Sequence, residues 1–120
     1  MKQKKETGGF EQFSFDYRGK KIRLPVIECS SIFSQMHGLM FSRRNNALLF
    51  TFRQRNRASI HSFFCPDFIV IYFDGNKIVD VKSITNWHFF IRSKAAFTHF
   101  LEIPVGNPVY LAILDGVRKI

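Results

Sequence analysis

Several features that mark common protein classes are missing from this 120-residue sequence. No apolar run approaches the roughly 20 residues that a membrane-spanning helix needs. The first nine residues, MKQKKETGG, are basic, but no apolar segment follows them, so an export signal is not indicated. Cysteine occurs only at Cys29 and Cys65, which form no CxxC pattern and no disulfide framework. We interpret them as two buried, reduced thiols in a cytoplasmic protein.

Common catalytic and metal-binding motifs are missing as well. There is no GxSxG, P-loop or GxGxxG pattern, so neither a serine-hydrolase elbow nor a phosphate-binding loop is supported. The histidines do not pair with one another at i,i+3 or i,i+4 spacing, and no cysteine or acid completes a zinc pattern around them. They are His37, His61, His88 and His99. We therefore expect neither a metal nor a cofactor.

Acidic residues are few compared with basic ones. Eighteen lysines and arginines oppose nine acids, which leaves a formal net charge of +9. An excess of this size favours polyanionic partners such as RNA, DNA or an acidic protein surface. Solubility, or life at high temperature or high salt, would explain the same excess without a partner.

The hydrophobic pattern predicts a hairpin at the centre of the fold, from Phe68 to Ile84. The run Phe68–Phe73 is apolar, short and rich in β-branched and aromatic residues, as in a strand covered on both faces. Gly75 and Asn76 tolerate the positive φ of a tight turn. On the return strand we expect Asp80 and Lys82 on a solvated face, with Val79 and Val81 together on the other.

Other segments predict one small β-rich domain over residues 10–120, preceded by a mobile basic tail over residues 1–9. A short helix is expected over about Ser31–His37, with Gly38 as its left-handed cap. Pro25 indicates an edge or a bend in its strand, and Trp87–Arg92 is expected to cover the core. Further strands are predicted at Phe10–Tyr17, Lys21–Ile27, Ala47–Phe52, Ile60–Cys65, Ala95–Ile103 and Val109–Leu114. The expected fold is mainly β, a small barrel-like or rolled antiparallel sheet with one short helix.

Five blocks in this order resemble a known family. They are Gly38–Phe41, Ala47–Phe52, Ile60–Cys65, the hairpin with Asp74, and Leu101–Gly106. Together they resemble the family catalogued as "domain of unknown function 192" over roughly residues 21–120, and His61 in the third block is similar to its archaeal branch. The resemblance implies a compact, mainly β domain with one short helix before the GLMF segment, and it implies no activity. Family members usually carry Pro-Ile-Asp before the hairpin, whereas this chain has Phe68-Ile69-Val70 there and its acid at Asp67.

Basic residues gather in loops that suit a phosphate backbone. Arg53, Arg55 and Arg57 would face one side if their strand continues through them. The candidate nucleic-acid-binding residues are Arg43, Arg44, Arg53, Arg55, Arg57, Lys20 and Lys21. The leading hypothesis is a non-enzymatic module that binds RNA or a ribonucleoprotein through these loops, and an acidic protein surface is a second partner of the same kind.

The alternative hypothesis is an enzyme or small-ligand-binding protein with a pocket near His61, Asp67 and Trp87. His61 is better explained as a half-buried strand histidine, hydrogen-bonded to the backbone, than as a general base. Asp67 is the one acid of the hairpin region that no turn or solvated strand face explains. Direct pairing of Cys65 with His61 is rejected, because i,i+4 residues on a strand are about 13 Å apart.

Overall fold

The computed structural model describes residues 10–29, 45–62, 65–85, 87–88, 90–115 and 118–119. Within them the chain forms a single sheet of seven strands in the order β1-β2-β3-β6-β4-β5-β7. The elements are β1 (Phe10–Tyr17), β2 (Lys20–Cys29), β3 (Ala47–Asn56), β4 (Phe68–Asp74), β5 (Lys77–Ile84), β6 (Phe97–Pro104), α2 (Tyr110–Leu114) and β7 (Arg118–Lys119). The prediction of a mainly β fold, a rolled sheet with a short helix, is confirmed for the described residues. The described helix is α2, and the sheet is antiparallel except where β2 pairs with β3 and β5 with β7.

The central hairpin consists of β4 and β5, as the sequence predicts. Six residues of β4, Phe68–Phe73, are buried, because β4 lies between β5 and β6 and is covered on both faces. Gly75 has a φ of +64° at the first turn position, which only glycine adopts at little cost, as in a type II′ turn.

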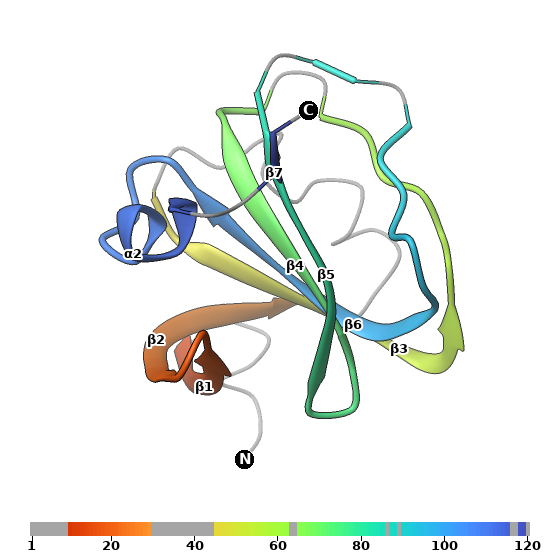
Figure 1. Ribbon diagram of the computed structural model, residues 1–120, viewed down its shortest axis with the longest axis horizontal. Coiled ribbons are helices and arrows are strands. Elements are labelled where there is room, and N and C mark those ends of the chain that lie inside the picture. The colour runs from red at the N-terminus through yellow and green to blue at the C-terminus, as the bar shows by residue number, and fades with distance from the viewer. Residues whose placement is uncertain are drawn as a thin grey trace.

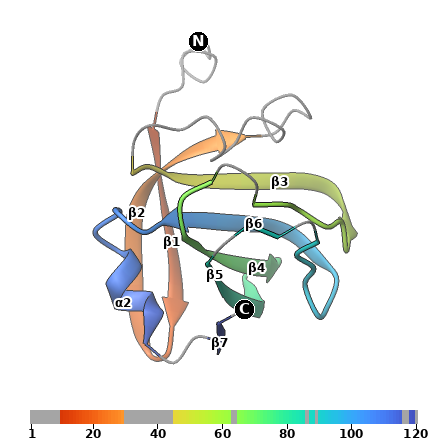
Figure 2. The same cartoon turned by 90° about the horizontal axis from the view of Figure 1, so that it is seen from above.

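The first hairpin, β1 and β2, folds over one face of the sheet. Arg18 and Gly19 both have positive φ, 52° and 83°, as the tight type I′ turn requires. β2 pairs antiparallel with β1 and then, from Val26 onward, parallel with β3. Figure 2 shows that this hairpin crosses β3 and β6 at a steep angle. Pro25 lies just before the parallel pairing begins, where β1 is the only described strand beside β2.

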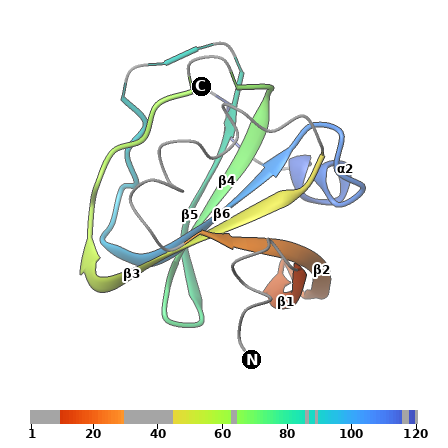
Figure 3. The ribbon, with the colours of Figure 1, turned by 180° about the vertical axis from the view of Figure 1, so that it is seen from behind.

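Hydrophobic side chains pack on both faces of the curled sheet. The first core lies inside the curl, under the first hairpin and α2, and contains Phe15, Leu24, Val26, Ala47, Leu49, Ile69, Ile71, Phe73, Leu101, Ile103, Tyr110 and Ile113. The second core lies on the other face and contains Cys29, Leu48, Phe50, Phe68, Val70, Tyr72, Ile84, Ile91, Phe97 and Phe100. Figures 1 and 3 show the long connections after β3 and β5 running side by side around this second face.

Two of the predicted strands are wrong. Val109–Leu114 is not a strand, because its last five residues form α2, with Tyr110 and Ile113 buried at i,i+3 spacing. In the predicted strand Ile60–Cys65, the described residues form only an isolated bridge, between Ile60 and Ile91. The chain then turns, because the Cys65 amide donates to the Ser62 carbonyl at 3.1 Å.

The solvated face predicted for β5 is also wrong. The side chains of Asp80 and Lys82 are only 10% and 16% exposed and form an ion pair at 3.3 Å. An irregularity in the pairing, where Tyr72 lies opposite Asp80 but Phe73 opposite Ile78, leaves Val79 as an extra residue. Val79 therefore packs against the second core and Val81 against the first.

The loop after residue 90 covers Asp80. The Lys94 amide donates to Asp80 Oδ2 at 2.8 Å and the Val81 amide to Oδ1 at 2.9 Å. The predicted tail over residues 1–9, the predicted helix over residues 31–37 with its cap at Gly38, and the loop residues Arg43 and Arg44 lie outside the described residues.

Candidate nucleic-acid interface

Two of the predicted arginines lie exposed at the end of β3. Ala47 and Leu49 face the first core, and strand alternation continues this face to Thr51. The pairing of β3 with β6 is irregular between Thr51 and Asn56, so Arg53 and Arg55 are placed by their exposure and by the contact that Arg55 makes. Arg55 reaches the tip of the β4–β5 hairpin, because its Nε lies 3.3 Å from Asp74 Oδ1. The row of arginines therefore ends beside the central hairpin.

Arg57 does not continue this row. β3 ends at Asn56, and the Arg57 guanidinium donates twice to the Ser93 carbonyl, from Nε at 3.1 Å and from Nη2 at 2.7 Å. Arg92 Nε in turn donates to the Arg57 carbonyl at 3.2 Å. Arg57 joins two loops, so its role is structural at least in part.

The other predicted cations lie on the first hairpin. Lys20 is exposed and pairs in register with Tyr17. Lys21 is exposed too, and its Nζ lies 3.8 Å from Asp16 Oδ1. An ion pair this open to solvent contributes little to stability, so Lys21 can exchange Asp16 for a phosphate at small cost.

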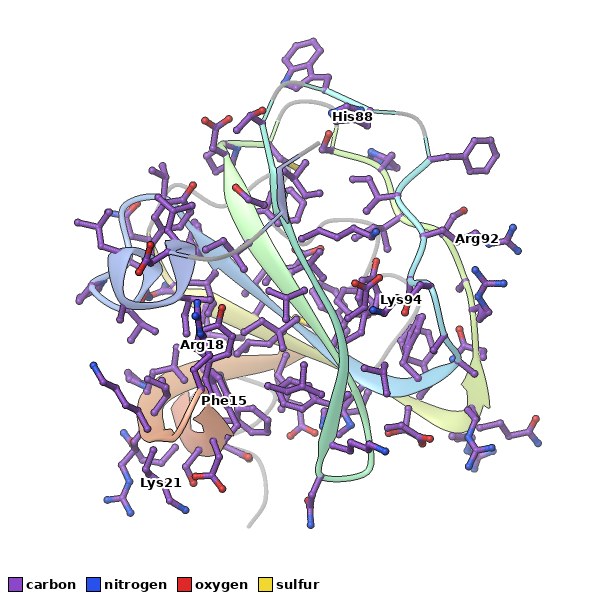
Figure 4. All side chains as sticks on the ribbon, viewed as in Figure 1. Phe15, Arg18, Lys21, His88, Arg92 and Lys94 are labelled. Atoms are coloured by element: carbon purple, nitrogen blue, oxygen red, sulfur yellow. The ribbon has the colours of Figure 1, made fainter. Side chains whose placement is uncertain are left out.

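A cavity of about 290 Å³ lies between the two basic groups. The first hairpin forms one wall, the tip of the β4–β5 hairpin forms another, and β6 contributes His99. The lining residues are Phe13, Ser14, Phe15, Asp16, Lys21, Phe73, Gly75, Asn76 and His99. Figure 4 labels Phe15 and Lys21 on the first hairpin, away from His88, Arg92 and Lys94. Lys21 thus borders the cavity on one side, and on the other Arg55 contacts Asp74, next to Gly75.

The residues of the alternative pocket, His61, Asp67 and Trp87, do not line this cavity. All three are exposed, Trp87 at 54%. His61 and Trp87 belong to two adjacent segments, since the Ser62 amide donates to the His88 carbonyl at 3.0 Å. The Asp67 carbonyl accepts from the Val105 amide at 2.8 Å, after the end of β6. The prediction that His61 lies in a strand is wrong. The distance of about 13 Å used to reject its pairing with Cys65 assumed that strand, so it no longer applies.

A buried acid, Glu102, is a feature that the sequence analysis missed. It lies on β6 opposite Leu48 of β3 and Val70 of β4, and burial raises its pKa to about 8. Burial, together with the Glu102 charge, raises the pKa of Cys29 to about 11 and that of Cys65 to about 12. Cys29 is buried and Cys65 only partly so, and at neutral pH both thiols remain protonated and unreactive. A lone acid in the predicted strand Ala95–Ile103 is the one sequence signal that pointed to Glu102.

Within the described part of the chain, no three His, Cys, Asp or Glu side chains are grouped closely enough to hold a metal ion. In the same residues, no helix has the length and apolar character needed to cross a membrane.

Comparison with known proteins shows the fold alone. No family model matches the sequence, and no curated protein is significantly similar to it. One similar crystal structure is that of a "putative transcription regulator" from Sinorhizobium meliloti 1021, with a TM-score of 0.68, 14% identity, and coverage of 80% of this chain and 82% of that one. Another is a protein of unknown function from Novosphingobium aromaticivorans DSM 12444, with a TM-score of 0.68, 13% identity, and coverage of 81% and 74%. The resemblance to "domain of unknown function 192" stays a prediction.

Proposed function

We propose that this protein is a non-enzymatic module that binds RNA at one edge of its sheet. The observation that carries the proposal is the position of two basic groups far apart in sequence. Lys20 and Lys21 lie on the first hairpin, and Arg53 and Arg55 lie at the end of β3, with the cavity and the tip of the central hairpin between them. This edge is called the basic edge below.

Charge supports a polyanion as the partner. The chain has a net charge of +9, and Arg53, Lys20 and Lys21 are exposed. Lysine and arginine side chains that neutralise phosphates release condensed counterions, which gives affinity without sequence preference. We also propose that the protein binds RNA in the cytoplasm and needs no cofactor to do so.

The test is a fluorescence polarisation titration of a single-stranded RNA at several salt concentrations. The site variant is Arg53→Gln with Arg55→Gln. Arg57 is left unchanged because it holds the Ser93 loop. We expect the slope of log affinity against log salt to become shallower by about 0.7 for each lost phosphate contact. Folding should be nearly unaffected, because exposed charges contribute little to stability.

Lys94→Gln is the control for a change in net charge, with one charge removed where the site variant removes two. It removes one positive charge from an exposed position away from Lys21, so it changes the net charge without touching the basic edge. Its slope should equal that of the wild type. No wild-type binding near physiological salt, or equal slopes for the site variant and the control, would contradict the proposal.

A further inference from the structure

The cavity at the basic edge has walls of aromatic rings in fixed positions. The Phe73 and His99 rings are stacked, with centroids 4.9 Å apart and planes 6° from parallel. Phe13 meets both edge to face, at 5.5 Å from Phe73 and 6.0 Å from His99. Phe15 contacts Phe73 at 5.6 Å. Phe15 and Phe73 are buried, at 7% and 1% exposed, and they hold the half-buried Phe13 and His99 rings in place. Fixed positions for those two rings lower the ordering cost of binding a flat ligand.

Polar side chains of four kinds also line the cavity. Ser14 supplies a hydroxyl, Asn76 an amide, Lys21 an ammonium group and Asp16 the carboxylate that faces Lys21. His99 Nδ1 lies 3.0 Å from Thr98 Oγ1, and among the described residues Nε2 has no hydrogen-bond partner. Burial lowers the pKa of His99, so at neutral pH the ring is uncharged. These groups can form hydrogen bonds with the edge of a heterocycle.

The size of the cavity limits the ligand. Its volume of about 290 Å³ is just below the usual range of small-molecule pockets, about 300–1,000 Å³. One base-sized heterocycle fits this volume better than a longer ligand. Two exposed cations, Lys21 on the cavity wall and Arg55 on Asp74 beside the hairpin tip, suit the phosphates that flank such a base.

We propose that this cavity binds one unpaired nucleobase, with the flanking phosphates on the basic edge. The inference rests on the proposed RNA binding and deepens it. Phe13 and His99 supply the apolar contact, while Asn76 and Ser14 contact the edge of the base. The same chemistry would recognise a base in a single-stranded RNA or in a free nucleotide, and the experiment separates the two sources.

The first arm compares two oligonucleotides on wild-type protein, so its result does not depend on the folding of a variant. One is a short single-stranded RNA, and the other has the same phosphates but abasic sugars. Loss of base contacts should weaken binding at least about fivefold, while the salt slope stays the same because every phosphate contact is kept. Equal affinities for the two oligonucleotides would overturn the base pocket and leave the phosphate-binding proposal standing.

The second arm tests whether the contact with the base lies in the cavity. Phe13→Leu removes a half-buried ring from the cavity, and Phe52→Leu is its matched control, because Phe52 is equally half-buried but contacts Phe97 and Phe100 in the second core. Phe13→Leu should lose at least about fivefold in RNA affinity with an unchanged salt slope, and Phe52→Leu should bind like the wild type. Equal losses in both variants would contradict a base contact at Phe13.

The third arm titrates a uridine or adenosine monophosphate and follows the backbone amide signals of Ser14, Asn76 and His99 by NMR. Changes at these amides support base recognition from a free nucleotide even if no RNA binds. If wild-type protein binds RNA but neither RNA nor mononucleotide changes these signals, the base pocket is wrong while RNA binding stands. If it binds neither ligand, both proposals fail.

Discussion

At the residue scale, the buried carboxyl group of Glu102 makes the folded protein less stable when it ionises. Glu102 is buried between β3 and β4, and desolvation favours its protonated form. The unfolded chain ionises this group near 4.5, whereas the folded chain holds the proton up to a pKa of about 8. Between these values the folded state binds more protons than the unfolded state, so stability falls as pH rises.

This imbalance gives a prediction for Glu102→Gln. The wild type should lose about 2 kcal/mol of unfolding free energy between pH 6 and pH 8 through this group alone, since each pKa unit corresponds to about 1.4 kcal/mol. The variant cannot ionise and should lack that loss. Urea titrations of both proteins at pH 6 and pH 8 measure the difference. Parallel pH dependences would show that Glu102 is not buried as described.

At the element scale, the sequence predicted the regular strands better than the short helix α2 and the irregular residue in β5. The first hairpin follows from apolar alternation and the central hairpin from a continuous apolar run, each with turn residues, and both form where expected. α2 was predicted as a strand because Val109, Tyr110 and Leu111 are apolar in succession, a pattern that short helices share with buried strands. The extra residue at Val79 has no local signal either, so the burial of Asp80 could not be foreseen.

The turn before α2 provides a second prediction. Asn107 Oδ1 accepts from the Val109 amide at 2.9 Å, and its Nδ2 donates to the Asn45 carbonyl at 2.7 Å. Asn107→Ala removes both hydrogen bonds and should cost about 1–2 kcal/mol of unfolding free energy. Gln12→Ala, at an exposed position of β1, is the control and should stay within about 0.5 kcal/mol. If Asn107→Ala also costs less than about 0.5 kcal/mol of unfolding free energy, then α2 is positioned by its apolar side chains alone.

At the scale of the whole molecule, the curl of the sheet assembles the basic edge. The sequence identified Lys20, Lys21, Arg53 and Arg55 as candidates from charge alone. It did not identify the cavity, because Phe13, Phe73 and His99 come from three elements that meet only when the first hairpin folds over β4 and β6. Each of these rings is explained by core packing when its segment is considered alone, so no local pattern distinguishes them from the rest of the core.

The central claim is that the two basic groups and the cavity between them form one RNA-binding surface. The most direct measurement is an NMR titration of ¹⁵N-labelled protein with a short single-stranded RNA, following every assigned amide. We predict that the signals of Lys20, Lys21, Arg53, Arg55, Gly75 and Asn76 move together along one binding curve, while those of His61, Asp67 and Trp87 do not move. Changes confined to His61, Asp67 and Trp87, with the basic edge unaffected, would contradict the account and favour a site on the loops of the second face.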